Sequence, residues 1–480
     1  MTARLRAAGL ALAALAAAVP ARPAAGQDVA ARRERLERRL MPRVVIRGEP
    51  ARSATLADRM AHYGVPAVSV AVINGGKTEW AQAWGLAEVA TGRAATPATL
   101  FQAASISKPV AATAALALVE KGRLDLDADV NRYLESWRLP PSDSQAGEPV
   151  TIRRLMTHTA GLTVHGFPGY ARSARIPTTA EVLDGKGNTA PVRVDLKPGA
   201  RWRYSGGGYT VLQLVLADLA DRPFAAVMRE LVLDPAGMTA STYEQPLPES
   251  RWDEAATAYR PDGRPVEEGW HVYPEQAAAG LWTTPSDLAR WGLAILAAYD
   301  GGTGGPLSPT MARQMLQPGL NNQGLGPAIG PARRWFGHGG SNEGFRCQLV
   351  VFMDGRGAVV MTNSDRGDAL ASEVLATLAD EYGWPDFRVT ERTVVPIAAT
   401  ALEELSGRYR VEGSPIELVV SAEGGRIFAE AEGALPRAEL LGESATVFFT
   451  RDEGITFRFV REGKDVTAVV VMGRRAIRQR

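Results

Sequence analysis

The sequence predicts an α+β protein, with one antiparallel sheet flanked by helices and then a small all-β domain at the C-terminal end. Three observations support this prediction. A hairpin is predicted near the N-terminus, and two further strands and a helix are predicted far along the chain. This arrangement indicates that the two ends of the main domain contribute strands to one antiparallel sheet. The segments between them are mostly helical in pattern. After about residue 397 the pattern changes to short strands at hairpin spacing.

The predicted strands and helices are marked by turn and capping residues. Strands at 67–73 and 77–85 flank an Asn-Gly-Gly turn, and strands at 347–353 and 357–361 flank an Asp-Gly turn. Helical patterns occupy residues 53–63, 105–121, 151–162, 210–219, 222–233, 286–299 and 368–382. Segments rich in Gly, Pro, Ser or Asp are expected to be loops, at 123–150, 301–305 and 324–330.

The chain is expected to divide into three parts. Residues 1–26 form a signal peptide, residues 27–390 form the main domain, and residues 397–480 form a small β-barrel-like domain. The strands predicted for this last domain cover 405–411, 416–420, 426–430, 447–449, 455–459 and 466–472.

Composition limits the classes of partner. The 480 residues carry a formal net charge of +1, from 54 basic and 53 acidic side chains. This near balance gives no electrostatic reason to expect nucleic acid or an anionic membrane surface as a partner. Cys347 is the only cysteine, so no disulfide can form within the chain.

The first 26 residues resemble a secretory signal. Arg4 and Arg6 form a basic start, residues 7–19 are apolar, and Ala24-Ala25-Gly26 offers small side chains for cleavage. No later stretch is long and apolar enough to cross a membrane. We therefore expect an exported bacterial protein, periplasmic or extracellular, with no stable membrane insertion after cleavage.

The first candidate catalytic motif is Ser105-x-x-Lys108, at the start of a helical stretch. Residues three apart on a helix lie on one face, so the amine can reach the hydroxyl. A buried lysine loses its proton more easily, and a neutral amine can accept the serine proton. Arginine, which is abundant here, cannot act as a base. Taken alone, the pattern also fits an ordinary helix with a surface lysine.

Two further motifs carry candidate site residues. Tyr204-Ser205-Gly206 begins a run of three glycines, so a phenol stands beside backbone that can approach other groups closely. That phenol can act as a general acid or base if a nearby cation lowers its pKa. The third motif is His338-Gly339-Gly340. Its two glycines leave room for a ligand along the strand edge, and His338 would place an imidazole over that ligand. Taken alone, these motifs also fit a packing tyrosine and a structural histidine.

Together, the order and spacing of the three motifs resemble those of the serine β-lactamase and penicillin-binding protein superfamily. The similar branch holds class C β-lactamases, D-alanyl-D-alanine carboxypeptidases, D-aminopeptidases and family VIII carboxylesterases. The resemblance covers roughly residues 45–385 and is supported by the stretches 155–162 and 280–285, which also recur in that family. It implies a β-lactamase-like sheet flanked by helices, an all-helical subdomain and a serine hydrolase activity.

The resemblance also implies a role for each motif residue. Ser105 would attack a carbonyl to form an acyl-enzyme, and Lys108 would take its proton. Tyr204 would protonate the leaving group, with His338 beside it in place of the family's lysine. The backbone N–H groups of Ser105 and Ser341 would hold the oxyanion, while Gly206, Gly339 and Gly340 would line the substrate.

Two departures from the family pattern bear on the substrate. Gly206 stands where β-lactamases and DD-peptidases usually have an asparagine that holds the substrate amide. His338 replaces a permanent cation that would hold a substrate carboxylate. These changes favour small esters, amides or peptides. D-aminopeptidase, DD-peptidase or β-lactamase activity remains an alternative, and so does a sensor that acylates at Ser105 without turnover.

The sequence lacks the motifs of other hydrolase classes. The sequence has no Gly-x-Ser-x-Gly of an α/β-hydrolase. It has no His-Glu-x-x-His, His158 and His165 are seven residues apart, and Cys347 stands alone, so a zinc site is not expected. We expect no metal and no cofactor, and a small-molecule substrate as the partner.

Overall fold

The computed structural model describes residues 25–50, 54–412, 416–431 and 435–479. Its central element is a seven-stranded antiparallel sheet in which β10 (Gly357–Thr362) pairs with β2 (Ala67–Asn74). This pairing joins the N-terminal hairpin to the C-terminal strands of the main domain, as the sequence predicts. The remaining strands of the sheet are β3 (Lys77–Glu88), β4 (Arg93–Ala94), β7 (Ala328–Ile329), β8 (Trp335–Asn342) and β9 (Phe345–Phe352).

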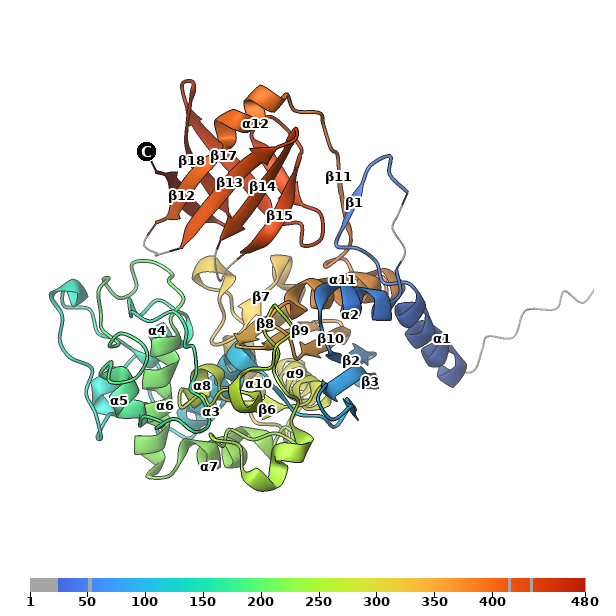
Figure 1. Cartoon of the computed structure of the whole chain (residues 1–480). Helices are drawn as coiled ribbons and strands as arrows, with labels where there is room; N and C mark the ends of the chain where they lie inside the picture. Colours follow the sequence, from blue (N-terminus) through green and yellow to red (C-terminus); the bar gives the residue numbers. More distant parts are fainter. Residues whose placement is uncertain (1–24, 51–53, 413–415, 432–434, 480) are drawn as a thin grey trace, which may run out of the picture.

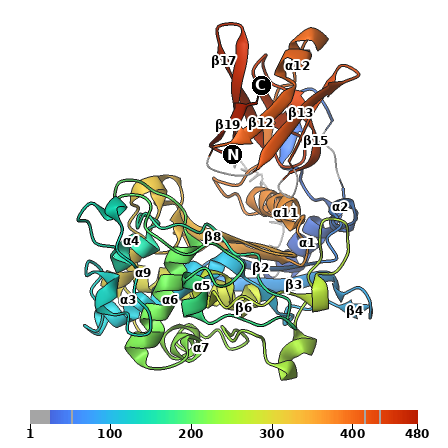
Figure 2. The same ribbon diagram turned by 60° about the vertical axis from the view of Figure 1, so that its left-hand side comes forward.

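Helices cover both faces of this sheet (Figures 1 and 2). Successive residues of β2 enter two different cores: Val68, Val70 and Val72 join one, while Ala71 and Ile73 join the other. One core is covered by the terminal helices α1 (Ala25–Arg38), α2 (Leu56–Tyr63) and α11 (Gly367–Glu381). The other core holds helices α3 (Ser107–Glu120), α4 (Ile152–Met156), α5 (Thr179–Leu183), α6 (Gly206–Ala220), α7 (Phe224–Met228), α8 (Gln276–Ala279), α9 (Pro285–Tyr299) and α10 (Pro309–Met315).

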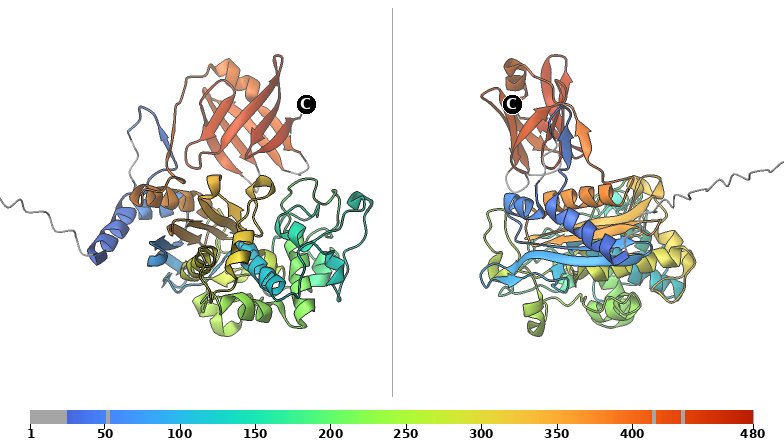
Figure 3. Two further views of the ribbon diagram at one scale, coloured as in Figure 1. Left: turned by 180° about the vertical axis from the view of Figure 1, so that it is seen from behind. Right: turned by 90° about the vertical axis from the view of Figure 1, so that its right-hand side faces the viewer.

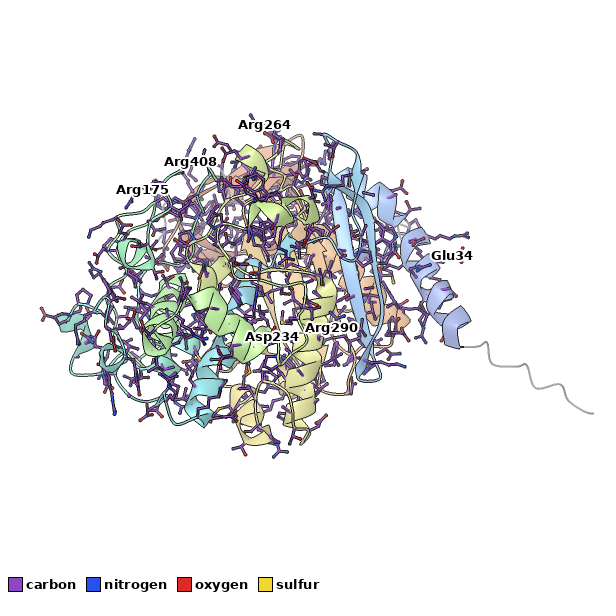
Figure 4. The ribbon with its side chains drawn as sticks, turned by 90° about the horizontal axis from the view of Figure 1, so that it is seen from below. Glu34, Arg175, Asp234, Arg264, Arg290 and Arg408 are labelled. Atoms are coloured by element: carbon purple, nitrogen blue, oxygen red, sulfur yellow. The ribbon has the colours of Figure 1, made fainter. Side chains whose placement is uncertain are left out.

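Helix α3 is the most enclosed of these helices. All residues from Ser107 to Leu118 are buried, because the helix is apolar around its whole circumference. Two short strands, β5 (Phe101–Gln102) and β6 (Trp282–Thr283), pair just before it. Seen from below, charged side chains such as Glu34 and Arg264 point outward at the periphery (Figure 4).

The C-terminal strands close into an eight-stranded barrel that stands over the main domain (Figures 1 and 3). Helix α12 (Ala399–Leu405) contributes Leu402 and Leu405 to the barrel core. A parallel pair, β1 (Val44–Ile46) and β11 (Thr390–Arg392), lies along the connecting segment. The barrel strands are β12 (Gly407–Val411), β13 (Glu417–Glu423), β14 (Arg426–Ala431), β15 (Leu435–Gly442), β16 (Val447–Thr450), β17 (Thr456–Glu462), β18 (Asp465–Val471) and β19 (Arg474–Arg478).

The predicted fold class is confirmed, while several element boundaries were wrong. The helix expected at 151–162 ends at Met156, and the helix expected at 210–219 begins at Gly206, because the side chain of Ser205 caps it. The segment 222–233 divides into α7 and a π-helical turn. Strands β15 and β19 were not predicted.

Candidate active site

Ser105 lies in a short 3₁₀ turn, Ala104–Ile106, directly before α3. Its neighbour Ala104 has a φ of 49°, in the left-handed region that alanine seldom adopts, at a cost of about 1–2 kcal/mol. Strand β8 packs against this turn so closely that a Cβ atom at Gly340 would overlap the carbonyl oxygen of Ala103. The glycine therefore brings the backbone of β8 next to the serine.

Lys108 reaches the serine from the first turn of α3. Its Nζ donates hydrogen bonds to Ser105 Oγ at 2.9 Å and to the carbonyl oxygen of Ala278 at 2.7 Å. The side chain is buried and has no ion pair with any residue that the structure describes. Burial disfavours the ammonium form and lowers the pKa of Lys108 to about 7. About half of the amine is therefore neutral at pH 7 and able to accept a proton.

Tyr204 lies beside both residues. Its ring centroid is 5.0 Å from Lys108 Nζ, and its hydroxyl interacts with the Ser105 side chain. Burial nevertheless dominates and raises the pKa of Tyr204, so the phenol keeps its proton at neutral pH. The condition stated from the sequence, a nearby cation that lowers this pKa, is not met, because burial raises the pKa of Tyr204 by more than the hydrogen bond with Ser105 lowers it.

Two histidines hold the Tyr204 ring. The ring centroids of His158 and His165 lie 4.2 and 4.9 Å from the ring centroid of Tyr204. The backbone N–H of Ser205 donates to His158 Nδ1 at 3.2 Å, which leaves the His158 proton on Nε2. Burial and the charge of Lys108 lower the pKa of His158. His158 is thus a neutral support for the tyrosine rather than a metal ligand.

His338 comes to the same place from strand β8. Its ring centroid lies 6.2 Å from that of Tyr204, and its Nδ1 donates to the carbonyl oxygen of Gly339 at 2.5 Å. Burial and the charge of Lys108 lower the pKa of His338 to about 4. The imidazole is therefore uncharged at neutral pH and offers a polar group but no cation.

Gly206 is enclosed by the segment that follows His165. Its N–H donates to the carbonyl oxygen of His165 at 3.0 Å. A Cβ atom at this position would lie 2.8 Å from the Phe167 ring and 3.0 Å from that same carbonyl oxygen. The phenyl ring therefore takes the space that a larger side chain would need.

The structure thus brings Ser105, Lys108, Tyr204 and His338 together, from the 3₁₀ turn Ala104–Ile106, from α3, from the residue before the Ser205 cap of α6 and from β8. Gly339, Gly340 and Ser341 follow His338 on the same strand, and Ser341 is exposed. Sequence reasoning missed two participants. The carbonyl of Ala278 belongs to a four-residue helix with no strong signal of its own, and His158 was considered only as a possible metal ligand.

A buried carboxyl lies just before that short helix. Glu275 is fully buried, and its oxygens find no hydrogen-bond partner on another residue that the structure describes. Burial raises the pKa of Glu275 to about 8. This side chain is therefore mostly protonated at neutral pH.

The described residues contain no group of three or more His, Cys, Asp or Glu side chains placed to hold a metal ion. None of the helices formed by these residues is long and apolar enough to span a membrane.

Comparisons with known proteins find similar chains. A family model described as Beta-lactamase matches residues 53–381. Esterase EstB of Burkholderia gladioli is 32% identical over 258 residues, covering 50% of this chain and 62% of the esterase, just under two thirds. Penicillin-binding protein 4* of Bacillus subtilis (strain 168) is 25% identical over 422 residues, covering 82% of this chain and 89% of that protein.

The fold also matches a solved structure along most of its length. The octameric penicillin-binding protein homologue from Pyrococcus abyssi superposes with a TM-score of 0.59 at 23% identity. The match covers 88% of this chain and 98% of that one. At this identity the likeness concerns the fold alone.

Proposed function

We propose that this chain, which belongs to the β-lactamase family of serine hydrolases, cleaves small esters or amides through an acyl-enzyme formed on Ser105. One observation carries the proposal: the buried amine of Lys108 lies 2.9 Å from the serine hydroxyl and has a pKa of about 7. A neutral amine at hydrogen-bond distance is what an unactivated serine needs to become a nucleophile.

The proposed reaction has two steps. As Ser105 Oγ bonds to the substrate carbonyl carbon, its proton passes to Lys108 Nζ, and the carbonyl oxygen becomes an oxyanion. When the oxyanion collapses, the bond to the leaving group breaks and Tyr204 donates its proton to that group. The lysine ammonium then returns a proton to the phenoxide. Water attacks the acyl-enzyme in the second step, releases the acid and restores the serine hydroxyl.

The oxyanion is assigned to backbone donors. The close packing of Gly340 against Ala103 supports an oxyanion hole made by the N–H groups of Ser105 and Ser341, because it brings β8 next to the serine turn. Donors of this kind are worth about 3–4 kcal/mol each in the transition state. Gly339 would let the substrate lie along the same strand.

The surroundings of Gly206 favour esters over β-lactams and DD-peptides. No side-chain amide is available there to hold a substrate amide, and Phe167 fills the space. His338 carries no charge with which to hold a carboxylate. An ester also expels its leaving group more readily than an amide does. Its cleavage therefore depends less on a side-chain amide or a cation that holds the substrate.

Turnover of p-nitrophenyl butyrate tests the proposal. The wild-type chain should release p-nitrophenol catalytically, and Ser105→Ala should abolish the release. A fluorophosphonate should label Ser105, identified by mass spectrometry of the labelled peptide. Lys108→Ala should be inactive, while Lys121→Ala, an exposed lysine at the far end of α3, should behave as wild type. Labelling at another residue would contradict the assignment.

The lack of a side chain at Gly206 also supports a second candidate function, a sensor that is acylated at Ser105 and does not turn over. Such a protein would release one equivalent of p-nitrophenol in a burst and then stop. D-aminopeptidase, DD-peptidase and β-lactamase activity are tested by D-amino-acid amides, D-alanyl-D-alanine peptides and nitrocefin. Sustained turnover of the ester would exclude the sensor.

Export also belongs to this proposal. The basic start and apolar run of residues 1–24 support a secretory signal, and these residues lie outside the described part of the chain. N-terminal sequencing of the mature protein from an exporting bacterial host should find cleavage near residue 26. An intact N-terminus in the cytoplasmic fraction would contradict it.

A further inference from the structure

The segment that carries Tyr204 has no regular secondary structure. Residues 202–205 belong to no helix or strand, and helix α6 begins only at Gly206. No helical or sheet ladder therefore fixes the backbone at Tyr204, and its position depends on hydrogen bonds to other segments of the chain. The residues directly before and after Tyr204 both donate such a bond to the same residue, His158.

His158 holds this segment with its backbone and with its ring. Its carbonyl oxygen accepts the N–H of Arg203 at 2.8 Å, and its Nδ1 accepts the N–H of Ser205 at 3.2 Å. Between these two bonds the imidazole packs on the Tyr204 ring, with 4.2 Å between the ring centroids and 31° between the ring planes. One residue therefore fixes the chain on both sides of Tyr204 and contacts the ring between them.

This arrangement costs the fold free energy. His158 has a φ of 57°, in the left-handed region that side chains disfavour. The side chain is only 2% exposed, and its Nε2, which carries the proton, has no hydrogen-bond partner among the residues that the structure describes. Packing alone requires no such unpaired donor, since an apolar side chain of similar size would avoid it. Backbone strain and unpaired buried groups of this kind are found at functional sites.

We propose that His158 is a positioning residue, which holds the phenol of Tyr204 where it can protonate the leaving group. This inference deepens the proposed function and rests on it, since Tyr204 is there the donor to the leaving group. Burial lowers the pKa of His158, so the ring stays neutral and its Nδ1 remains an acceptor. Without this acceptor the Ser205 N–H loses its partner and the phenol can shift, and a displacement of about 1 Å is enough to slow a reaction by about 10².

The test compares two butyrate esters whose leaving groups differ in their need for a proton. The p-nitrophenolate ion leaves without one, whereas the ethoxide of ethyl butyrate leaves poorly unless it is protonated. His158→Leu should lower kcat/KM for ethyl butyrate by about 10², and kcat/KM for p-nitrophenyl butyrate by less than about threefold. A merely structural role would lower both values by the same factor. His158→Ala gives the same comparison if the leucine variant does not fold.

A rescue variant and a matched control sharpen the comparison. In His158→Asn the side-chain oxygen can take the place of Nδ1, and asparagine tolerates left-handed backbone. This variant should therefore keep the wild-type ratio of the two kcat/KM values within about threefold. His62→Asn makes the same exchange at an exposed histidine on α2 and should change the turnover of neither ester.

A double variant shows whether His158 acts through the phenol. Tyr204→Phe should lose ethyl butyrate turnover selectively, and adding His158→Leu should cause no further selective loss. A further loss, equal losses for both esters in His158→Leu, or a His158→Asn ratio as low as that of His158→Leu would overturn the positioning role. Wild type that cleaves only the p-nitrophenyl ester would overturn it too. Failure of the proposed function is a separate result, since wild type would then cleave neither ester.

Discussion

The protonation of Lys108 makes a sharp prediction about the pH dependence of catalysis. With a pKa of about 7, the neutral amine makes up about half of the lysine at pH 7 and about 1% at pH 5. For p-nitrophenyl butyrate, kcat/KM should therefore fall roughly tenfold per pH unit below pH 6 and level off above pH 8. An ordinary exposed lysine, with a pKa near 10.4, would instead give a rate that still rises at pH 10.

Initial rates measured between pH 5 and 10, corrected for spontaneous hydrolysis, give this profile. Lys108→Arg should lower kcat/KM by about 10²–10⁴, because a guanidinium keeps its proton. His338→Gln is the control: the pKa of His338 is about 4, so its replacement should leave the inflection near pH 7 in place. A flat profile from pH 5 to 9, or a Lys108→Arg variant as active as wild type, would refute the role of the lysine as base.

Three other predictions follow from the packing of the site. Gly206→Asn should lower ester turnover by about tenfold or more, because the Cβ atom of the new side chain would lie 2.8 Å from the Phe167 ring. The variant should not gain nitrocefin hydrolysis. Adding Phe167→Ala should restore part of the ester turnover. Gly340→Ala should lower stability by about 1–3 kcal/mol in denaturant unfolding, while Gly166→Ala, whose Cβ meets open space, should not. Because the pKa of Glu275 is raised to about 8, its proton is bound more tightly in the folded state, and stability falls as pH rises from about 4.5 to 8. Glu275→Gln should remove this loss, stabilising the fold by roughly 3–5 kcal/mol at pH 8 and little at pH 4.5; equal unfolding curves at pH 8 would contradict it.

Local pattern was sufficient to predict the fold class and the proximity of Ser105 to Lys108, whereas the candidate site as a whole was predicted from the order and spacing of three separate motifs. Ser105 and Lys108 are one helical turn apart, so their proximity follows from helix geometry alone. The hairpin of β2 and β3 follows from alternation and a turn signal in adjacent residues. Element boundaries were less predictable. Glycines have a low helix propensity, yet α6 begins at Gly206 because the Ser205 side chain caps the helix there.

Only the tertiary structure decided the chemistry of the site. The low pKa of Lys108 depends on the burial of its amine by segments that are distant in the sequence, and this burial has no local pattern. The neutrality of His338 and the position of the Phe167 ring beside Gly206 likewise depend on contacts between distant segments. Charge states respond to the solvent and charges that surround a group, and these surroundings exist only once the distant segments have packed together.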